Sequence, residues 1–272
     1  MDDFEAKYFE DLRKLALGLT DKRKELAKSR IKMFAAAITR QILDEKQKFD
    51  LIIGAGNSGL FMTKLAEFVF ETLDVKIPPI LNIPVLRIIE KDESIKVVKS
   101  GNFELKNITK LENVLFVDDE IMRAITAKTC FELILAKRPE IEHLNATIVA
   151  EHHFFEWHYS LPKVSIKFFA YSWLIQWLNG NISYLTPENL FNEIKNALPE
   201  VESYPKAMAI IVGGGLKKVA DEQPYFDFAV EKELEDKIEN YKKQKKELMS
   251  EIRELVSEGV EGYKTGKIHF RF

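Results

Sequence analysis

The sequence predicts an α/β fold in which a central, mostly parallel sheet is flanked by helices. Short continuous apolar runs, which suit strands buried on both faces, occur at residues 50–53, 114–117, 143–150 and 164–170. Helical patterns separate most of these runs, and strands alternating with helices indicate a parallel sheet of four or five strands. Glycines or polar residues stand where the runs end, and ligands of such sheets bind at those ends.

The composition is that of an ordinary globular protein. The chain has 272 residues, of which 46% are hydrophobic and 31% charged, and its formal net charge is −3. That charge argues against nucleic acid as the main partner. Cys130 is the only cysteine, which excludes an internal disulfide and a multi-cysteine zinc site. The acidic N-terminus has no signal core and no apolar run is long enough to span a membrane, so we expect a cytoplasmic protein.

Residues 1–48 are predicted to form helices that pack on the core. Apolar side chains recur at three- and four-residue steps between Phe4 and Leu19, and again between Ile31 and Ile42. Thr20 and Asp21 have capping side chains and predict a break between two helices. We assign this segment no chemistry.

A glycine-rich turn follows the first apolar run and precedes a helix expected to reach about Leu73. It consists of Gly54, Ala55, Gly56, Asn57, Ser58 and Gly59. Its glycines allow a sharp turn that presents amide groups to an anion at the helix start. The sequence of this turn also fits a dinucleotide-binding motif. In that motif an acidic residue lies about 20 residues further on, at the end of the next strand. The next strand expected here, residues 85–89, leads to Glu90, which lies 31 residues beyond Gly59, so the spacing counts against that interpretation.

Residues 90–111 are polar and rich in lysine, with Lys91 and Lys99 among them. We expect a strand around residues 95–98 and a loop or hairpin about residues 100–102. Two interpretations are open. The segment is either a solvated hairpin or a mobile lid whose lysines reach a phosphate-rich ligand.

An acidic pair, Asp118 and Asp119, comes directly after the run at residues 114–117. Glu120 follows it, and a helix is expected at residues 126–137. Adjacent carboxylates repel one another unless a cation or the hydroxyl groups of a polyol compensate. The pair therefore indicates a bound sugar or metal, with a helix cap as the alternative.

Two more strand ends carry residues that suit a ligand. Residues 151–158 include His152, His153 and His158, which predict either a transition-metal site or a polar loop at the rim of a pocket. The run at residues 164–170 ends in an aromatic cluster that includes Trp173.

Residues 183–272 are predicted to form a mixed, mainly helical extension. The expected elements are a helix from Pro187 to about Leu198, a strand at residues 207–212, a long charged helix at residues 229–258 that ends at Gly259, and an edge strand at residues 267–272. Gly213–Gly215 is either a tight turn or a second phosphate loop. The apolar stripe of the long helix packs on the N-terminal helices or pairs with a second subunit, which would make a homodimer.

In this order the motifs resemble a type I phosphoribosyltransferase. That family's signature for 5-phosphoribosyl-1-pyrophosphate (PRPP) consists of apolar residues, Asp-Asp, two residues and Thr-Thr-Gly-x-Thr. Asp118 and Asp119 match its acidic positions and Thr126 its closing threonine, with the spacing intact. The Gly54–Gly59 turn resembles the pyrophosphate loop of the family. The resemblance covers roughly residues 35–180, so residues 49–182 would be the phosphoribosyltransferase-like core.

The resemblance implies transfer of phosphoribose between PRPP and a nitrogenous base, with Mg²⁺. Asp118 and Asp119 would bind the ribose hydroxyl groups and the metal, and Lys91 and Lys99 would assist catalysis. The donor's phosphates would bind the glycine turn and the segment of Glu120, Arg123, Ala124, Ile125 and Thr126, while Trp173 would stack on the base. The partner would be a small phosphoribosyl donor or a nucleotide.

The signature also departs from the family pattern. Met122, Arg123 and Ala124 replace Thr-Thr-Gly, so two hydroxyl donors are lost and a methyl group is gained that could obstruct a phosphate or forbid a positive φ. Arg123 offers guanidinium donors in exchange. Three functions remain open: an active phosphoribosyltransferase, a non-catalytic nucleotide-binding regulator on the same fold, and a dinucleotide-binding protein.

Overall fold

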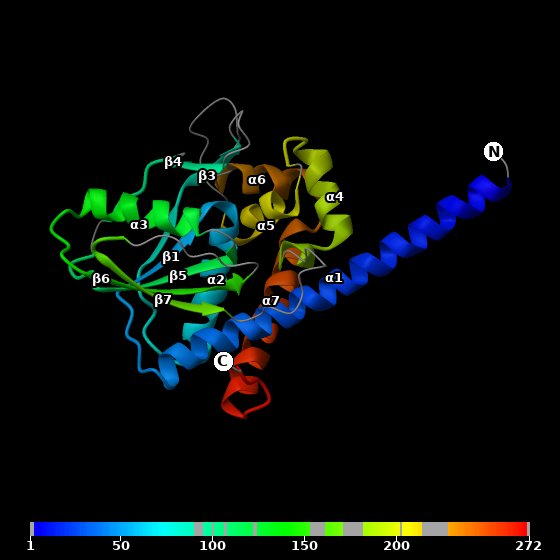
Figure 1. Cartoon of the computed structure of the whole chain (residues 1–272). Coiled ribbons are helices and arrows are strands. Elements are labelled where there is room, and N and C mark those ends of the chain that lie inside the picture. Colours follow the sequence, from blue (N-terminus) through cyan, green and yellow to red (C-terminus); the bar gives the residue numbers. More distant parts are fainter. Residues whose placement is uncertain are drawn as a thin grey trace.

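A central sheet of five parallel strands organises the molecule (Figure 1). The computed structural model describes residues 3–89, 95–99, 101–105, 108–121, 124–152, 161–170, 182–201, 203–213 and 228–270. The strands of the sheet are β1 (Leu51–Ala55), β2 (Ile80–Ile83), β5 (Asn113–Ile121), β6 (Leu144–His152) and β7 (Val164–Ala170). The predicted α/β class, with a parallel sheet between helices, is confirmed.

The strand order β2-β1-β5-β6-β7 places the chain's first strand between β2 and β5. Helix α2 (Gly56–Thr72) leads from β1 to β2, and α3 (Ile125–Lys137) leads from β5 to β6. The order of strands therefore reverses between β1 and β5. In open α/β sheets, ligands bind outside the carboxyl ends of the strands at such a point.

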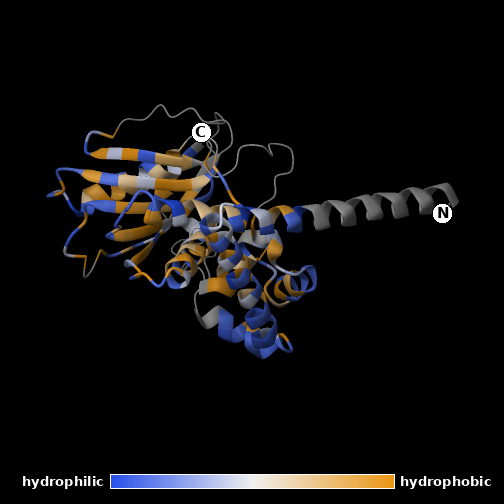
Figure 2. Ribbon diagram, turned by 90° about the horizontal axis from the view of Figure 1, so that it is seen from below, coloured by the Kyte–Doolittle hydropathy of each residue, from blue (hydrophilic) through white to orange (hydrophobic). Residues whose placement is uncertain are grey.

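Each face of the sheet is covered by its own layer. Ile52 points into a cluster built with α1 (Asp3–Leu43), α2 and α7 (Tyr241–Lys264), whereas its neighbours Leu51 and Ile53 point into a cluster with α3. Burial on both faces explains why these strands are continuous apolar runs rather than alternating ones. Figure 2 shows the strands as largely hydrophobic.

A separate two-stranded hairpin, β3 (Val85–Ile89) and β4 (Ile95–Lys99), packs against α3. The expected strand at residues 85–89 exists, but it belongs to this hairpin. It is not the next strand of the central sheet, which is the strand that the spacing of a dinucleotide-binding motif refers to. That strand is β2, which the sequence does not predict because it is short, lies at the edge and has only one fully buried residue, Ile83.

Helix α1 is continuous from Asp3 to Leu43, so the predicted break at Thr20 and Asp21 is wrong. Residues with capping side chains also occur inside helices when the chain on either side is helical.

The part of the chain after residue 182 is largely helical, as predicted, and includes η1 (Ile182–Leu185) and α4 (Glu188–Ala197). The predicted strand at residues 207–212 is wrong, because these residues belong to α5 (Tyr204–Gly213). Ala207, Met208 and Ile210 of this helix are buried, so it has too little polar surface to show a helical period. A short apolar run of this kind does not distinguish a strand from a buried helix.

The long charged helix is divided into α6 (Phe228–Lys237) and α7, with Asn240 between them at φ +60°. Asparagine tolerates this left-handed conformation better than most residues. Gly259 does not end α7, which continues to Lys264, and residues 267–270 form no strand. The apolar stripe packs on α1 and α2, which confirms one of the two interpretations that the sequence left open.

No helix in the described part of the chain combines the length and apolar character that crossing a bilayer requires.

Candidate functional site

The Gly54–Gly59 turn, which consists of the end of β1 and the start of α2, needs all three of its glycines. A Cβ atom on Gly54 would lie 2.4 Å from the carbonyl oxygen of Gly59, and one on Gly59 would lie 2.5 Å from the carbonyl carbon of Gly54. Gly56 has φ +59°, which favours glycine. The turn therefore brings the start of α2 into direct contact with the end of β1.

Two helices begin at the carboxyl edge of adjacent strands without a side-chain cap. The N-cap of α2 is Ala55 and that of α3 is Ala124, and neither first turn carries an acidic residue. The first amide groups of a helix have no acceptor within the helix, and the helix dipole adds partial positive charge there. Each start is therefore suited to an anion such as a phosphate group.

The acidic pair lies on a bulge in β5. Val117 pairs with Val149 of β6 and Glu120 pairs with Glu151, so Asp118 and Asp119 together oppose Ala150 alone. Bulges redirect side chains and are frequent beside active sites. The amide of Asp119 donates a hydrogen bond of 3.0 Å to Oδ1 of Asp118.

The two aspartates differ in exposure. Asp118 is only 3% exposed, whereas Asp119 and Glu120 are half-buried. Asp119 is therefore the more accessible member of the pair.

Cys130 has no catalytic role in this site. Burial, followed by the charge of Asp118, raises the pKa of the Cys130 thiol, so this cysteine stays protonated and is not a nucleophile.

A buried ion pair extends the site toward α1. Nη2 of Arg30 donates a 2.7 Å hydrogen bond to Oε1 of Glu151, and both residues are buried. Burial raises the pKa of Glu151 to about 7, Arg30 opposes that shift, and Glu120 and Asp119 add to it. In the sequence, Glu151 stands out only as part of residues 151–158, and no sequence signal points to Arg30.

The structure brings Lys99 close to the glycine turn. Lys99 pairs with Val85 across the hairpin, and the Val85 carbonyl oxygen lies 3.3 Å from where a Cβ of Gly56 would be. The exposed ammonium group of Lys99 donates to Oδ1 of Asn102 at 3.0 Å. Lys91, Arg123 and Trp173 lie outside the described residues, as do His153 and His158 and the side chain of His152.

Asn82 of β2 holds the glycine turn from its other side. Its Nδ2 donates a 2.9 Å hydrogen bond to the carbonyl oxygen of Gly56, and its Oδ1 is buried without a partner among the described residues. β2 ends at Ile83, and Pro84 follows it. The strand that should carry the acidic ribose ligand of a dinucleotide site therefore has no carboxylate at its end, which argues against that function.

The donor set at the acidic pair suits a hard cation. Mg²⁺ in nucleotide sites uses one or two carboxylates and completes its shell with water and phosphate oxygens. Asp118 and Asp119 meet that requirement. No group of three or more candidate metal ligands occurs among the described residues.

Several solved structures of other proteins are similar to part of this chain. A hypothetical protein from Neisseria gonorrhoeae with bound ppGpp is 17% identical, with a TM-score of 0.41 over 54% of this chain and 80% of its own. Xanthine-guanine-hypoxanthine phosphoribosyltransferase from Helicobacter pylori is 11% identical, with a TM-score of 0.31 over 50% and 84%. Hypoxanthine phosphoribosyltransferase from Staphylococcus aureus is 15% identical, with a TM-score of 0.32 over 53% and 74%. No protein-family model matches the chain, and no curated protein sequence matches it.

Proposed function

We propose that this chain is a phosphoribosyltransferase-like protein that binds PRPP or a nucleoside monophosphate at the carboxyl edge of β1 and β5. One observation carries the proposal: two uncapped helix starts, at Gly56 and Ile125, flank the pair Asp118 and Asp119 where the strand order reverses. Neighbouring strands are about 5 Å apart, so a single ligand can reach both helices and the carboxylates.

The charges of the groups in the site suggest which part of the ligand each of them binds. The first amide groups of α3, around Ile125 and Thr126, bind the 5′-phosphate, and those of the Gly54–Gly59 turn bind the pyrophosphate. Asp119 accepts hydrogen bonds from the ribose hydroxyl groups. Asp118, which already accepts from the amide of Asp119, orients that residue.

Mg²⁺ would be held by Asp119 and Asp118 and by the donor's own oxygens. When bound, it would neutralise charge on the departing pyrophosphate. Transfer of phosphoribose forms a bond from an acceptor nitrogen to C1 of the ribose and breaks the bond from C1 to pyrophosphate. The protein's contribution is to position the reactants and to stabilise charge.

Calorimetry on the full chain tests the binding. We expect heat on titration with PRPP and Mg²⁺, and loss of at least tenfold in affinity in Asp119→Asn, which removes a charged acceptor. Glu142→Gln is the matched control, since Glu142 is an exposed carboxylate before β6, at the opposite edge. Absence of heat with PRPP and with every nucleoside monophosphate would refute the proposal.

A non-catalytic nucleotide-binding regulator is the second candidate. It is favoured by the replacement of Thr-Thr-Gly by Met122, Arg123 and Ala124, which removes two hydroxyl donors from the phosphate segment. Release of pyrophosphate, measured with a panel of bases, separates the two candidates. Product formation rules out the regulator, and binding without product rules out the transferase.

A further inference from the structure

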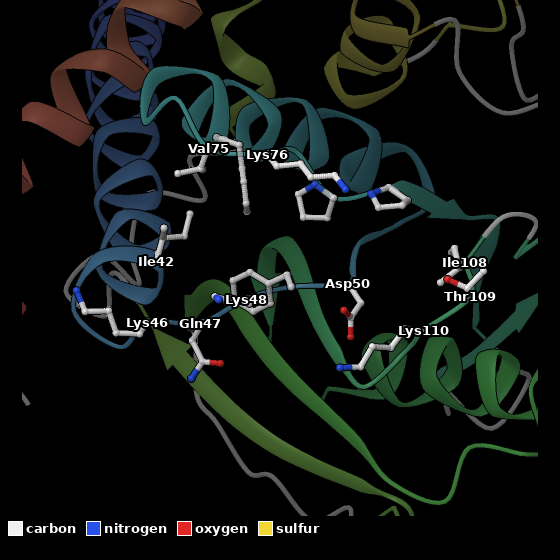
Figure 3. Close-up of a pocket in the computed structure, with 14 residues that line it drawn as sticks. Ile42, Lys46, Gln47, Lys48, Asp50, Val75, Lys76, Ile108, Thr109 and Lys110 are labelled. Carbon is white, nitrogen blue, oxygen red and sulfur yellow. The ribbon is translucent and has the colours of Figure 1, made fainter.

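A groove of about 590 Å³ lies at the opposite edge of the sheet from the acidic pair (Figure 3). Most of its lining comes from the end of α1 and from the segments that precede β1, β2 and β5. All three segments enter strands, so the groove is at the amino edge. Asp118 lies eight positions after Lys110 along a nearly extended chain, which corresponds to roughly 25 Å. A ligand in the groove would therefore not touch the candidate site.

The floor of the groove is apolar. Ile42, Phe49 and Val75 line it and are only half-buried, although each packs against the core cluster below. Figure 3 shows Ile42 and Val75 on the side of α1 and α2, and Thr109 and Lys110 on the side of the segment that precedes β5. An apolar group seated between them would remove this surface from water, which favours binding.

The rim of the groove is positively charged. Lys46, Lys48 and Lys76 are exposed, and no carboxylate of the described residues pairs with them. Lys110 is the fourth lysine and pairs with Glu112 at 2.9 Å.

Among the described lining residues the one carboxylate is Asp50, and its charge acts on Lys110, whose pKa is raised first by the hydrogen bond to Glu112 and also by Asp50. Oδ2 of Asp50 accepts hydrogen bonds of 2.9 Å from the backbone amides of Glu112 and Asn113, so it is engaged in fixing the start of β5. Three lysines from two separate segments thus remain without a described counter-charge.

We propose that this groove binds a small organic anion with an apolar body. The volume lies within the range of about 300–1,000 Å³ that is usual for small-molecule sites, and the lining is the usual combination of an apolar floor with a few polar groups. Two chemical sources share these features, a hydrocarbon carboxylate and an aryl phosphate. The apolar body lies on the floor, and the anionic head lies near Lys46, Lys48 and Lys76.

A fluorescence titration with 8-anilinonaphthalene-1-sulfonate, which is itself an apolar anion, tests the proposal on the full chain. We expect saturable binding that decanoate or phenyl phosphate displaces and that decanol and inorganic phosphate do not. The identity of the displacing anion distinguishes the two sources. Salt should weaken binding, because the Debye length shrinks from about 10 Å at 0.1 M to about 3 Å at 1 M.

The triple variant Lys46→Gln, Lys48→Gln, Lys76→Gln should weaken the probe about tenfold or more, since it removes the charges that attract the anion. The control is Lys195→Gln, Lys232→Gln, Lys246→Gln, which removes three exposed lysines of α4, α6 and α7 and should leave affinity unchanged. Equal affinity in both triple variants would overturn the proposal. So would displacement by decanol, or displacement by an acidic peptide but by neither small anion.

Discussion

Ala124 begins α3 with a left-handed backbone, at φ +56° and ψ 12°. It occupies the position at which the PRPP signature has glycine, where the added methyl group could forbid a positive φ. The structure shows that it does not. The left-handed conformation costs an L-residue about 1–2 kcal/mol, so the chain keeps the glycine-like turn despite the substitution.

Ala124→Gly is therefore expected to raise the free energy of unfolding by up to about 1 kcal/mol. The relieved strain exceeds the added entropy of a glycine in the unfolded chain, which is about 0.4–1 kcal/mol. Ala127→Gly is the matched control, because Ala127 lies in the same helix, and its replacement should destabilise by about 1 kcal/mol. Chemical denaturation measures both, and a similar loss in the two variants would contradict the reading of Ala124 as strained.

Glu151 makes the stability of the protein depend on pH. Its pKa in the folded chain is about 7, raised chiefly by burial, against about 4.3 in an unfolded chain. Between these values the folded chain binds more protons than the unfolded one. The stability that this group contributes is therefore greatest at low pH and falls as the pH rises toward 7.

We expect the stability of the wild type relative to Glu151→Gln to fall by about 3 kcal/mol between about pH 5 and pH 8. Urea denaturation at several pH values measures this difference. Glu142→Gln, an exposed carboxylate, should follow the wild type throughout. A wild type that gains stability over Glu151→Gln in this range would show that Arg30 outweighs burial.

At the scale of elements, α1 and α7 meet at a close helix crossing. A Cβ on Gly259 would lie 2.4 Å from the carbonyl oxygen of Lys32 and 2.9 Å from Cβ of Ala35, so the helices touch through backbone. Gly262, less than one turn further on, differs. The three atoms nearest to its Cβ would all belong to the side chain of Ile268, with Cδ1 at 2.9 Å.

Gly259→Ala should destabilise the protein by about 1–3 kcal/mol, because the helices must move apart. Gly262→Ala is the control, since Ile268 can move aside and alanine favours the helix by about 1 kcal/mol. Thermal unfolding should show a lower Tm for the first variant and an equal or higher one for the second. Equal shifts of Tm in both variants would mean that helix propensity, and not the contact with α1, determines how alanine changes the stability.

Elements with a distinctive local pattern were predictable. The strands around Leu115 and Ile148, and the helices that start at Gly56 and Ile125, agree with the predictions, because buried strands and their ends have clear sequence signals. The errors fell where packing overrides the local pattern. The sequence of α5 predicts a strand because the helix is buried on most sides, and Gly259 predicts a helix end although it lies at the contact with α1.

At the scale of the whole molecule, one core cluster joins parts distant in sequence. Ile38 of α1, Leu65 of α2, Ile211 of α5 and Ile252 of α7 share it with one face of the sheet. The C-terminal helices thus complete the layer over that face, and the sequence alone did not show which face they would cover.

The parallel sheet, the glycine turn and the acidic pair can be predicted from the sequence, because each depends on residues close together in the chain. Their surroundings cannot, because they come from distant parts of the chain. Arg30 comes within 2.7 Å of Glu151 across 121 positions of sequence, and Asn82 rather than an acid faces the glycine turn. The amino-edge groove likewise gathers residues from separate segments. Contacts between such distant residues depend on how the strands are ordered, and strand order leaves no local pattern in the chain.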